Sequence, residues 1–66
     1  MDITHNHEVS TPNGPGVMVG MMQEDNLQFM VIRHQVHQMT GQTAGRNLTP
    51  RALVSGLWQY DPSEIK

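Results

Sequence analysis

The chain has 66 residues, a formal net charge of −2 and no cysteine, which allows one domain and excludes disulfides and thiolate metal sites. Its single lysine and three scattered arginines argue against a sequence-independent grip on nucleic acid, which needs clustered cations. A chain this short buries a small share of its surface, so a well-packed barrel or self-association must supply its stability.

The pattern of the N-terminal segment does not predict a signal peptide. MDITHNHEVS lacks the basic start and apolar run of a signal peptide, and no apolar run in the chain approaches the roughly 18 residues that span a bilayer. The sequence therefore predicts a cytoplasmic protein with no membrane partner. Residues 1–10 alternate weakly in polarity, which fits an edge strand or a loose arm preceding a single domain at 11–66.

Turn residues and a first strand follow. TPNGPG at 11–16 predicts a turn-rich loop, because its two prolines and two glycines cannot continue a helix or a central strand. Residues 17–22 predict a strand in which Gly20 marks a bulge or a bend. QEDN at 23–26 then predicts an ordinary hairpin loop.

The second strand of this hairpin is predicted at 27–36, with a possible continuation to His37. A helix is the alternative, but the β-branched pair Val31-Ile32 favours a strand. Both faces of the hairpin are apolar, and Gly20 offers a bend. These features predict two walls of a closed barrel.

The last third of the chain is less regular. MTGQTAGRN at 39–47 predicts a polar loop. LTPRALVS at 48–55 fits a strand or, with slight preference, a helical turn with Thr49 as N-cap and Pro50 at N1. LWQY at 57–60 predicts a short strand, and DPSE at 61–64 predicts a capping box around one closing turn.

The order TPNGPG, GVMVG, hairpin, long loop and closing LWQYDPSEI resembles the small SH3-like β-barrels, including Tudor-like and KOW-like modules. The resemblance spans roughly residues 11–65 and is architectural. It implies a mostly β fold, an SH3-like barrel of about five short strands with a short helical turn near the C-terminus. It also implies a module that binds peptides, nucleic acids or other proteins. The chain departs from the barrels that form an aromatic cage or a groove for proline-rich peptides, because it has one Phe, one Trp and one Tyr: Phe29, Trp58 and Tyr60.

Four histidines form two pairs, His5-x-His7 and His34-x-x-His37, which are weak candidates for a Zn²⁺ or Ni²⁺ site. The two residues of the first pair share a face in a strand, whereas the second pair needs a helix or a bulge. Unconnected histidines are the simpler interpretation. No metal and no cofactor is therefore predicted.

No serine lies in a recognisable nucleophile elbow, and no acids converge, so a non-enzymatic protein without catalytic residues is predicted. The candidate binding residues are of the types that dominate interface energetics: Trp58, Tyr60, Arg33, Arg46 and Arg51. Trp58 alternatively plugs the core. The prediction is a small accessory module, similar in style to short phage or mobile-element proteins. It binds a protein partner or forms a homo-oligomer; the alternative is a nucleic-acid-binding barrel that uses the three arginines.

Overall fold

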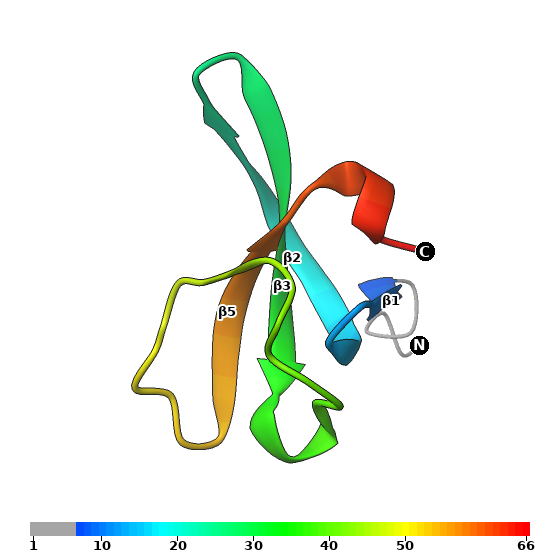
Figure 1. The fold of residues 1–66 in the computed structure, drawn as a ribbon, viewed down its shortest axis with the longest axis vertical. Helices are drawn as coiled ribbons and strands as arrows, with labels where there is room; N and C mark the ends of the chain where they lie inside the picture. Colours follow the sequence, from blue (N-terminus) through cyan, green and yellow to red (C-terminus); the bar gives the residue numbers. More distant parts are fainter. Residues whose placement is uncertain (1–6) are drawn as a thin grey trace.

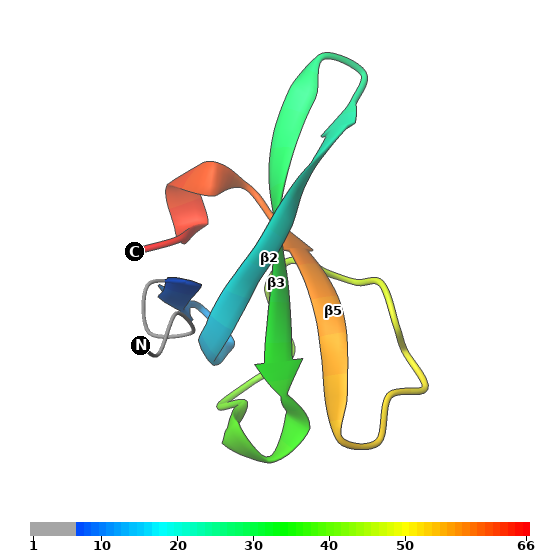
Figure 2. The ribbon, with the colours of Figure 1, turned by 180° about the vertical axis from the view of Figure 1, so that it is seen from behind.

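The structure is a computed structural model, of which residues 7–66 are described. Five strands form one antiparallel sheet in the order β1-β2-β3-β5-β4 (Figure 1, Figure 2). The elements in chain order are β1 (Glu8–Thr11), β2 (Gly14–Glu24), β3 (Leu27–Gln35), the 3₁₀ helix η2 (Val36–Gln38), β4 (Arg46–Asn47), β5 (Ser55–Tyr60) and the 3₁₀ helix η3 (Pro62–Glu64). The predicted mostly β fold is confirmed.

The first turn is tighter than predicted. Thr11 pairs with Gly14, so only Pro12 and Asn13 lie between the strands, and Pro15 belongs to β2. The prediction that all of 11–16 is a loop was wrong. Pro15 is tolerated because the ladder between β2 and β3 begins only at Val17, so the missing N–H breaks no bond there.

The second turn is also a two-residue turn. Glu24 pairs with Leu27, and Asp25 and Asn26 have φ values of 49° and 69°. Two successive positive φ values are typical of the type I′ hairpin turn, whose twist matches that of the strands. The register shifts between Met18 and Gly20, which confirms the predicted irregularity near Gly20.

Two local features in the second half of the chain differ from the prediction: the strand predicted at 27–36 forms but is one residue shorter, and the preferred helical turn at 48–55 is absent. The strand β3 ends at Gln35, and His37 lies in η2. No helix forms at 48–55. The Thr49 hydroxyl accepts the Leu57 N–H at 2.7 Å instead of capping a helix, and the Thr49 carbonyl accepts the Ala52 N–H in a single turn.

The closing segment has the predicted geometry. The Asp61 carboxylate accepts the Ser63 N–H at 3.0 Å, and the Glu64 carboxylate accepts the Asp61 N–H at 3.2 Å. Together with Pro62 at the start of η3, this is the predicted capping box. Within the described part of the chain, no helix has the length and apolar character needed to cross a membrane.

The sheet is not closed by its strands. The short strands β1 and β4 occupy opposite edges and do not pair with each other, so the predicted closed barrel does not form from the described strands. The chain nevertheless returns to β1 after η3. Ser10 and Lys66 exchange two backbone hydrogen bonds, each 3.0 Å long. Among the described residues, Lys66 alone, and not a strand, therefore pairs with the outer edge of β1.

The core lies on one face of the sheet, which we call the inner face. Ile32, Trp58 and Tyr60 are buried there, with the two aromatic rings stacked at a centroid distance of 6.4 Å. Met39 and Ala44 from the loop at 39–45 pack on this cluster, as does Ile65 after η3. The opposite, outer face carries residues of the other strand parity, including Val17, Val31, Arg33, Leu57 and Gln59.

Candidate functional site

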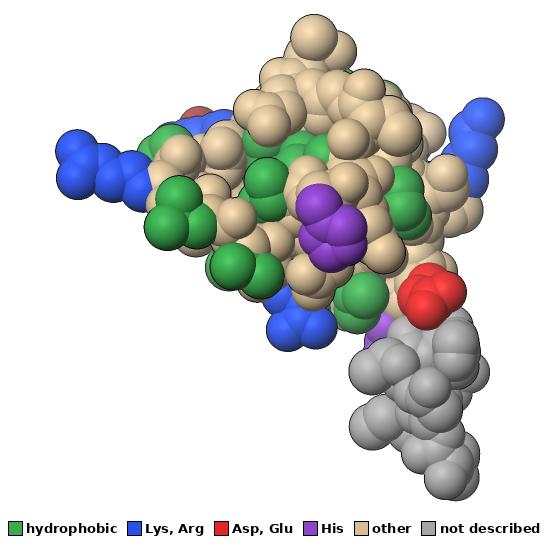
Figure 3. All heavy atoms as spheres, turned by 90° about the horizontal axis from the view of Figure 1, so that it is seen from below, with side chains coloured by type: hydrophobic (Ala, Val, Ile, Leu, Met, Phe, Trp, Pro, Cys, Tyr) green, Lys and Arg blue, Asp and Glu red, His purple; other side chains and the backbone are tan. Residues whose placement is uncertain are grey.

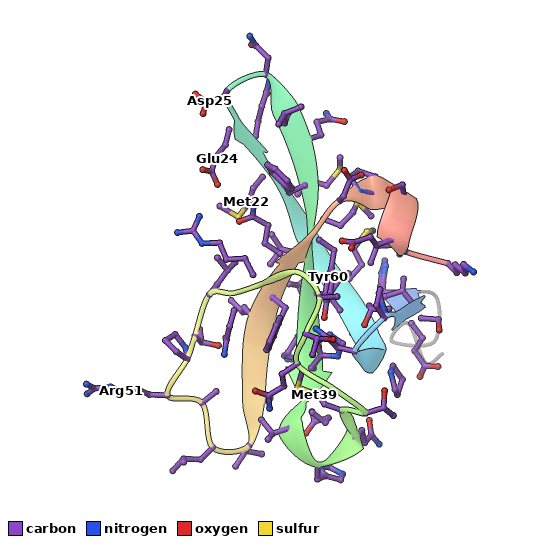
Figure 4. All side chains as sticks on the ribbon, viewed as in Figure 1. Met22, Glu24, Asp25, Met39, Arg51 and Tyr60 are labelled. Atoms are coloured by element: carbon purple, nitrogen blue, oxygen red, sulfur yellow. The ribbon has the colours of Figure 1, made fainter. Side chains whose placement is uncertain are left out.

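A buried polar cluster lies beside the core and joins the first turn to the rest of the fold. It consists of Thr11, Asn13, His34 and Tyr60, each at most 9% exposed. The turn at 12–13 brings Asn13 inward. His34 and Tyr60 lie on the inner face together with Ile32 and Trp58, because each is two residues from one of them along its strand. Figure 4 shows Tyr60 at the centre of the molecule, where the strands cross.

The Tyr60 hydroxyl is the hub of this cluster. Asn13 Nδ2 donates to it at 2.8 Å, and its oxygen lies 2.6 Å from His34 Nε2. His34 Nδ1 lies 2.8 Å from the Pro15 carbonyl oxygen, which can only accept. The partners therefore assign the imidazole proton to Nδ1, with Nε2 accepting the Tyr60 O–H. Every side chain of the cluster is committed to an internal partner, so the cluster stabilises the fold and offers no reactive group.

Alkaline pH is expected to weaken the fold through Tyr60. Burial raises the pKa of the Tyr60 hydroxyl above its ordinary value, and the hydrogen bonds with Thr11 and Asn13 offset this only in part. The folded state keeps the proton at a pH where the unfolded chain releases it. The free energy of unfolding is therefore unaffected by this group below about pH 9 and falls as the pH rises past about 10.

Urea titrations at a series of pH values measure this decline, and the ultraviolet absorbance of phenolate follows Tyr60 directly, because it is the only tyrosine in the chain. In Tyr60→Phe, the part of the alkaline fall in the free energy of unfolding that comes from the Tyr60 hydroxyl should be absent. An identical alkaline decline in the variant would contradict the assignment.

The two aromatic candidates lie in the core. Trp58 is 5% and Tyr60 1% exposed, so the structure supports the core-plug alternative for Trp58. Contact between either ring and a partner would require the core to open. Sequence reasoning missed that the Tyr60 hydroxyl forms buried hydrogen bonds with Asn13 and Thr11. The one available signal was the position of His34, which continues the inward-facing parity of Met30 and Ile32.

The three described histidines do not form a metal-binding group. His34 is buried and engages Pro15 and Tyr60, whereas His7 and His37 are exposed, and His5 lies outside the described residues. Among residues 7–66, no three His, Cys, Asp or Glu side chains are grouped so that they could hold a metal ion.

A cleft of about 560 Å³ lies on the outer face where β1, β2 and β3 meet. Its polar lining comes from four parts of the chain: Glu8, Ser10, Arg33, Gln35, Gln38 and Lys66. Lys66 reaches it because the chain end is hydrogen-bonded to Ser10. Among the ionic groups of this lining, two are cations and one is an acid.

The three candidate arginines do not form one patch. Arg33 lines the cleft, and Arg46 lies on β4, where its guanidinium is 3.8 Å from the Glu24 carboxylate. Arg51 lies on the loop before β5 and points away from the sheet (Figure 4). Figure 3 likewise shows Lys and Arg side chains at separate places around one face of the molecule. Register nevertheless places Arg33 and Arg46 on the same outer face, one on each side of β5.

Comparisons with protein-family models, with curated proteins and with solved structures gave no match to this chain. Its function must therefore be inferred from its own surface.

Proposed function

We propose that this domain is a non-enzymatic binding module that holds a segment of a partner protein in the cleft on its outer face. The observation that supports the proposal is the cleft itself, about 560 Å³ in volume and lined by residues from β1, β2 and β3. This volume lies in the range of protein sites for small ligands and peptide side chains. Rigid strands form most of its wall, so little ordering is needed on binding.

The lining favours an acidic segment. Arg33 and Lys66 contribute two positive charges, and Glu8 contributes one negative charge. The Arg33 guanidinium is exposed and carries a planar set of donors that matches a carboxylate. Gln35 and Gln38 offer amide groups that can both donate to and accept from a peptide backbone. We therefore expect a partner segment with an Asp or Glu side chain opposite Arg33.

The fold agrees with a role of this kind. The paired backbone of Ser10 and Lys66 brings Lys66 against β1, and the sequence resembles the SH3-like barrels in its order of elements. Such barrels serve as binding modules. Asn13, His34 and Tyr60 themselves do not line the cleft, so binding there need not displace their side chains.

Selection of a random peptide library against the full chain tests the proposal. We expect the selected peptides to be enriched in Asp and Glu and to lose affinity for Arg33→Gln. A hydrogen bond to a charged group contributes about 1.5–3 kcal/mol, so calorimetric titration should show a loss of about 10- to 150-fold. Arg51→Gln removes the same charge outside the cleft and is the matched control.

The same variants separate this proposal from its nucleic-acid alternative, which rests on Arg33 and Arg46 sharing the outer face. Affinity for mixed-sequence RNA or DNA that falls steeply with salt, and is lost in Arg46→Gln as well as Arg33→Gln, would replace the proposal with that alternative. Selected peptides that bind Arg33→Gln as tightly as the unchanged chain would overturn the cleft as the site.

A further inference from the structure

The hairpin formed by β2 and β3 extends beyond the other strands. Strand β1 pairs with β2 only up to Val17, and β5 pairs with β3 only from Met30 onward. Residues 20–29, which we call the hairpin arm, therefore have only each other as strand neighbours within the described chain, and the arm projects from the body (Figure 1, Figure 2). An isolated two-stranded hairpin is marginally stable in water.

Within residues 7–66, the outer edge of the arm has backbone groups without a strand partner at defined residues. The residues that flank a two-residue turn exchange hydrogen bonds, and hydrogen-bonded pairs then alternate with non-bonded ones. Counting from Glu24 and Leu27, the pair Met22–Phe29 is hydrogen-bonded, and the backbone N–H and C=O groups of Met21 and Gln23 point away from β3. The same alternation, counted from the first turn, places the backbone N–H and C=O groups of Ser10 on the side away from β2. There these groups form hydrogen bonds with the backbone of Lys66.

This edge has few of the features that keep edge strands apart. Charged residues, prolines and bulges on an edge normally prevent pairing with another chain. Residues 16–23 contain no charged residue and no proline, and the segment Gly20–Glu24 carries one charge, at Glu24. Met21 is instead 56% exposed, and Leu27 at the far end of the arm is 60% exposed. The irregularity between Met18 and Gly20 limits the regular edge to Gly20–Glu24.

We propose that two copies of this chain pair antiparallel along Gly20–Glu24, with the two-fold axis at Met22. In this register Met21 of each copy lies opposite Gln23 of the other, which joins the outward-pointing groups in four inter-chain backbone hydrogen bonds. The result is a four-stranded sheet that continues across both copies. The contact is isologous, so it closes at a dimer.

Side chains in this register are compatible. Met22 of one chain lies opposite Met22 of the other on the outer face. Glu24 of each chain lies opposite Gly20 of the other. A side chain in place of Gly20 would meet no heavy atom within 4 Å, so there is room beside it for the partner's Glu24. The two Glu24 residues are four positions apart along the strands, about 13 Å, which is beyond the Debye length in physiological salt. No like charges are placed opposite one another.

Cysteine substitution tests whether the two-fold axis lies at Met22. Because the chain has no cysteine of its own, any disulfide must form between the introduced residues. Residues opposite each other in a non-hydrogen-bonded pair have Cα atoms about 4.5 Å apart, within the range that a disulfide bridges. In a glutathione redox buffer, Met22→Cys should form a covalent dimer at least about tenfold faster than Leu53→Cys, because pairing raises the effective concentration of its thiol. Leu53 is 91% exposed and lies off the arm, so it is the control.

Two further measurements make the test decisive. Light scattering on the unchanged chain should show its mass rising toward that of a dimer with concentration. A mixture of Met21→Cys and Gln23→Cys chains should form the mixed disulfide in preference to either homodimer. A chain that stays monomeric at near-millimolar concentration would overturn the proposal. So would equal cross-linking of Met22→Cys and Leu53→Cys, or the absence of a preference for the mixed disulfide. None of these outcomes depends on peptide binding in the cleft, whose lining contains no residue of the arm.

Discussion

Replacing Gly16 by alanine is expected to unfold most of the protein. A Cβ atom at Gly16 would overlap the Ile32 Cγ2 methyl and lie 3.0 Å from His34 Nδ1 and 3.1 Å from the Arg33 carbonyl oxygen. Ile32 and His34 are fully buried, so neither side chain has space to move into. Moving His34 would also break its contact with Pro15. Overpacking of a core costs about 1–3 kcal/mol, and the lost buried hydrogen bond adds about 1–3 kcal/mol.

That sum approaches the whole stability of a domain this small, about 3–5 kcal/mol. Urea unfolding followed by the fluorescence of Trp58, the only tryptophan, measures the change. Gly20→Ala is the matched control in the same strand, since its Cβ would meet nothing within 4 Å. We expect it to change stability by less than about 1 kcal/mol. Equal losses in the two variants would show that Gly16 does not lie against Ile32.

Replacing Asn13 by alanine is expected to be nearly as damaging. Asn13 is fully buried, and its amide nitrogen donates to the Ala44 carbonyl and the Tyr60 hydroxyl, both at 2.8 Å. Its amide oxygen accepts the Ala44 N–H at 3.2 Å. The substitution leaves both backbone groups of Ala44 without these partners, at a cost of about 1–3 kcal/mol for each group that remains buried. We expect a total loss of about 3 kcal/mol from these two groups.

Urea unfolding gives the global loss, and hydrogen exchange at the Ala44 amide reports the local one. The amide should exchange faster in Asn13→Ala than the global loss of stability explains, because the loop at 39–45 loses its attachment to the first turn. Thr43→Ala, at an exposed position of the same loop, is the control and should leave both measurements nearly unchanged. A fully protected Ala44 amide in Asn13→Ala would contradict this attachment.

Local sequence signals predicted the parts of the fold that depend on neighbouring residues. The β-branched pair Val31-Ile32 identified β3 as a strand, and Asp61, Pro62 and Glu64 specified their own capping box, because all its bonds lie within four residues. The helical turn at 48–55 failed for the opposite reason. Thr49 has a cap-forming hydroxyl, but Leu57, eight residues away, takes it as an acceptor when β5 forms.

The candidate sites depended on long-range pairing and were less accessible to sequence reasoning. Arg33 was identified as a binding candidate, but the cleft that it lines needs Glu8 and Lys66, which the chain brings together only in the folded state. His34 was grouped with His37 by spacing. Its partners Pro15 and Tyr60 follow from strand register, which no local pattern specifies. Trp58 and Tyr60 were binding candidates by residue type, with a core position as the alternative for Trp58, and inward parity in β5 buries both rings.

The position of β5 has a consequence for the order in which the protein folds. This strand comes last in the chain, yet it lies between β3 and β4 and supplies Trp58 and Tyr60 to the core. A nascent chain can close the two hairpin turns as they emerge, but it has no core until Tyr60 has been synthesised. Contacts this distant in sequence make folding slow compared with that of helical domains of similar size. Until then the edge of β3 that β5 will cover is open, and pairing of this edge with another chain competes with folding.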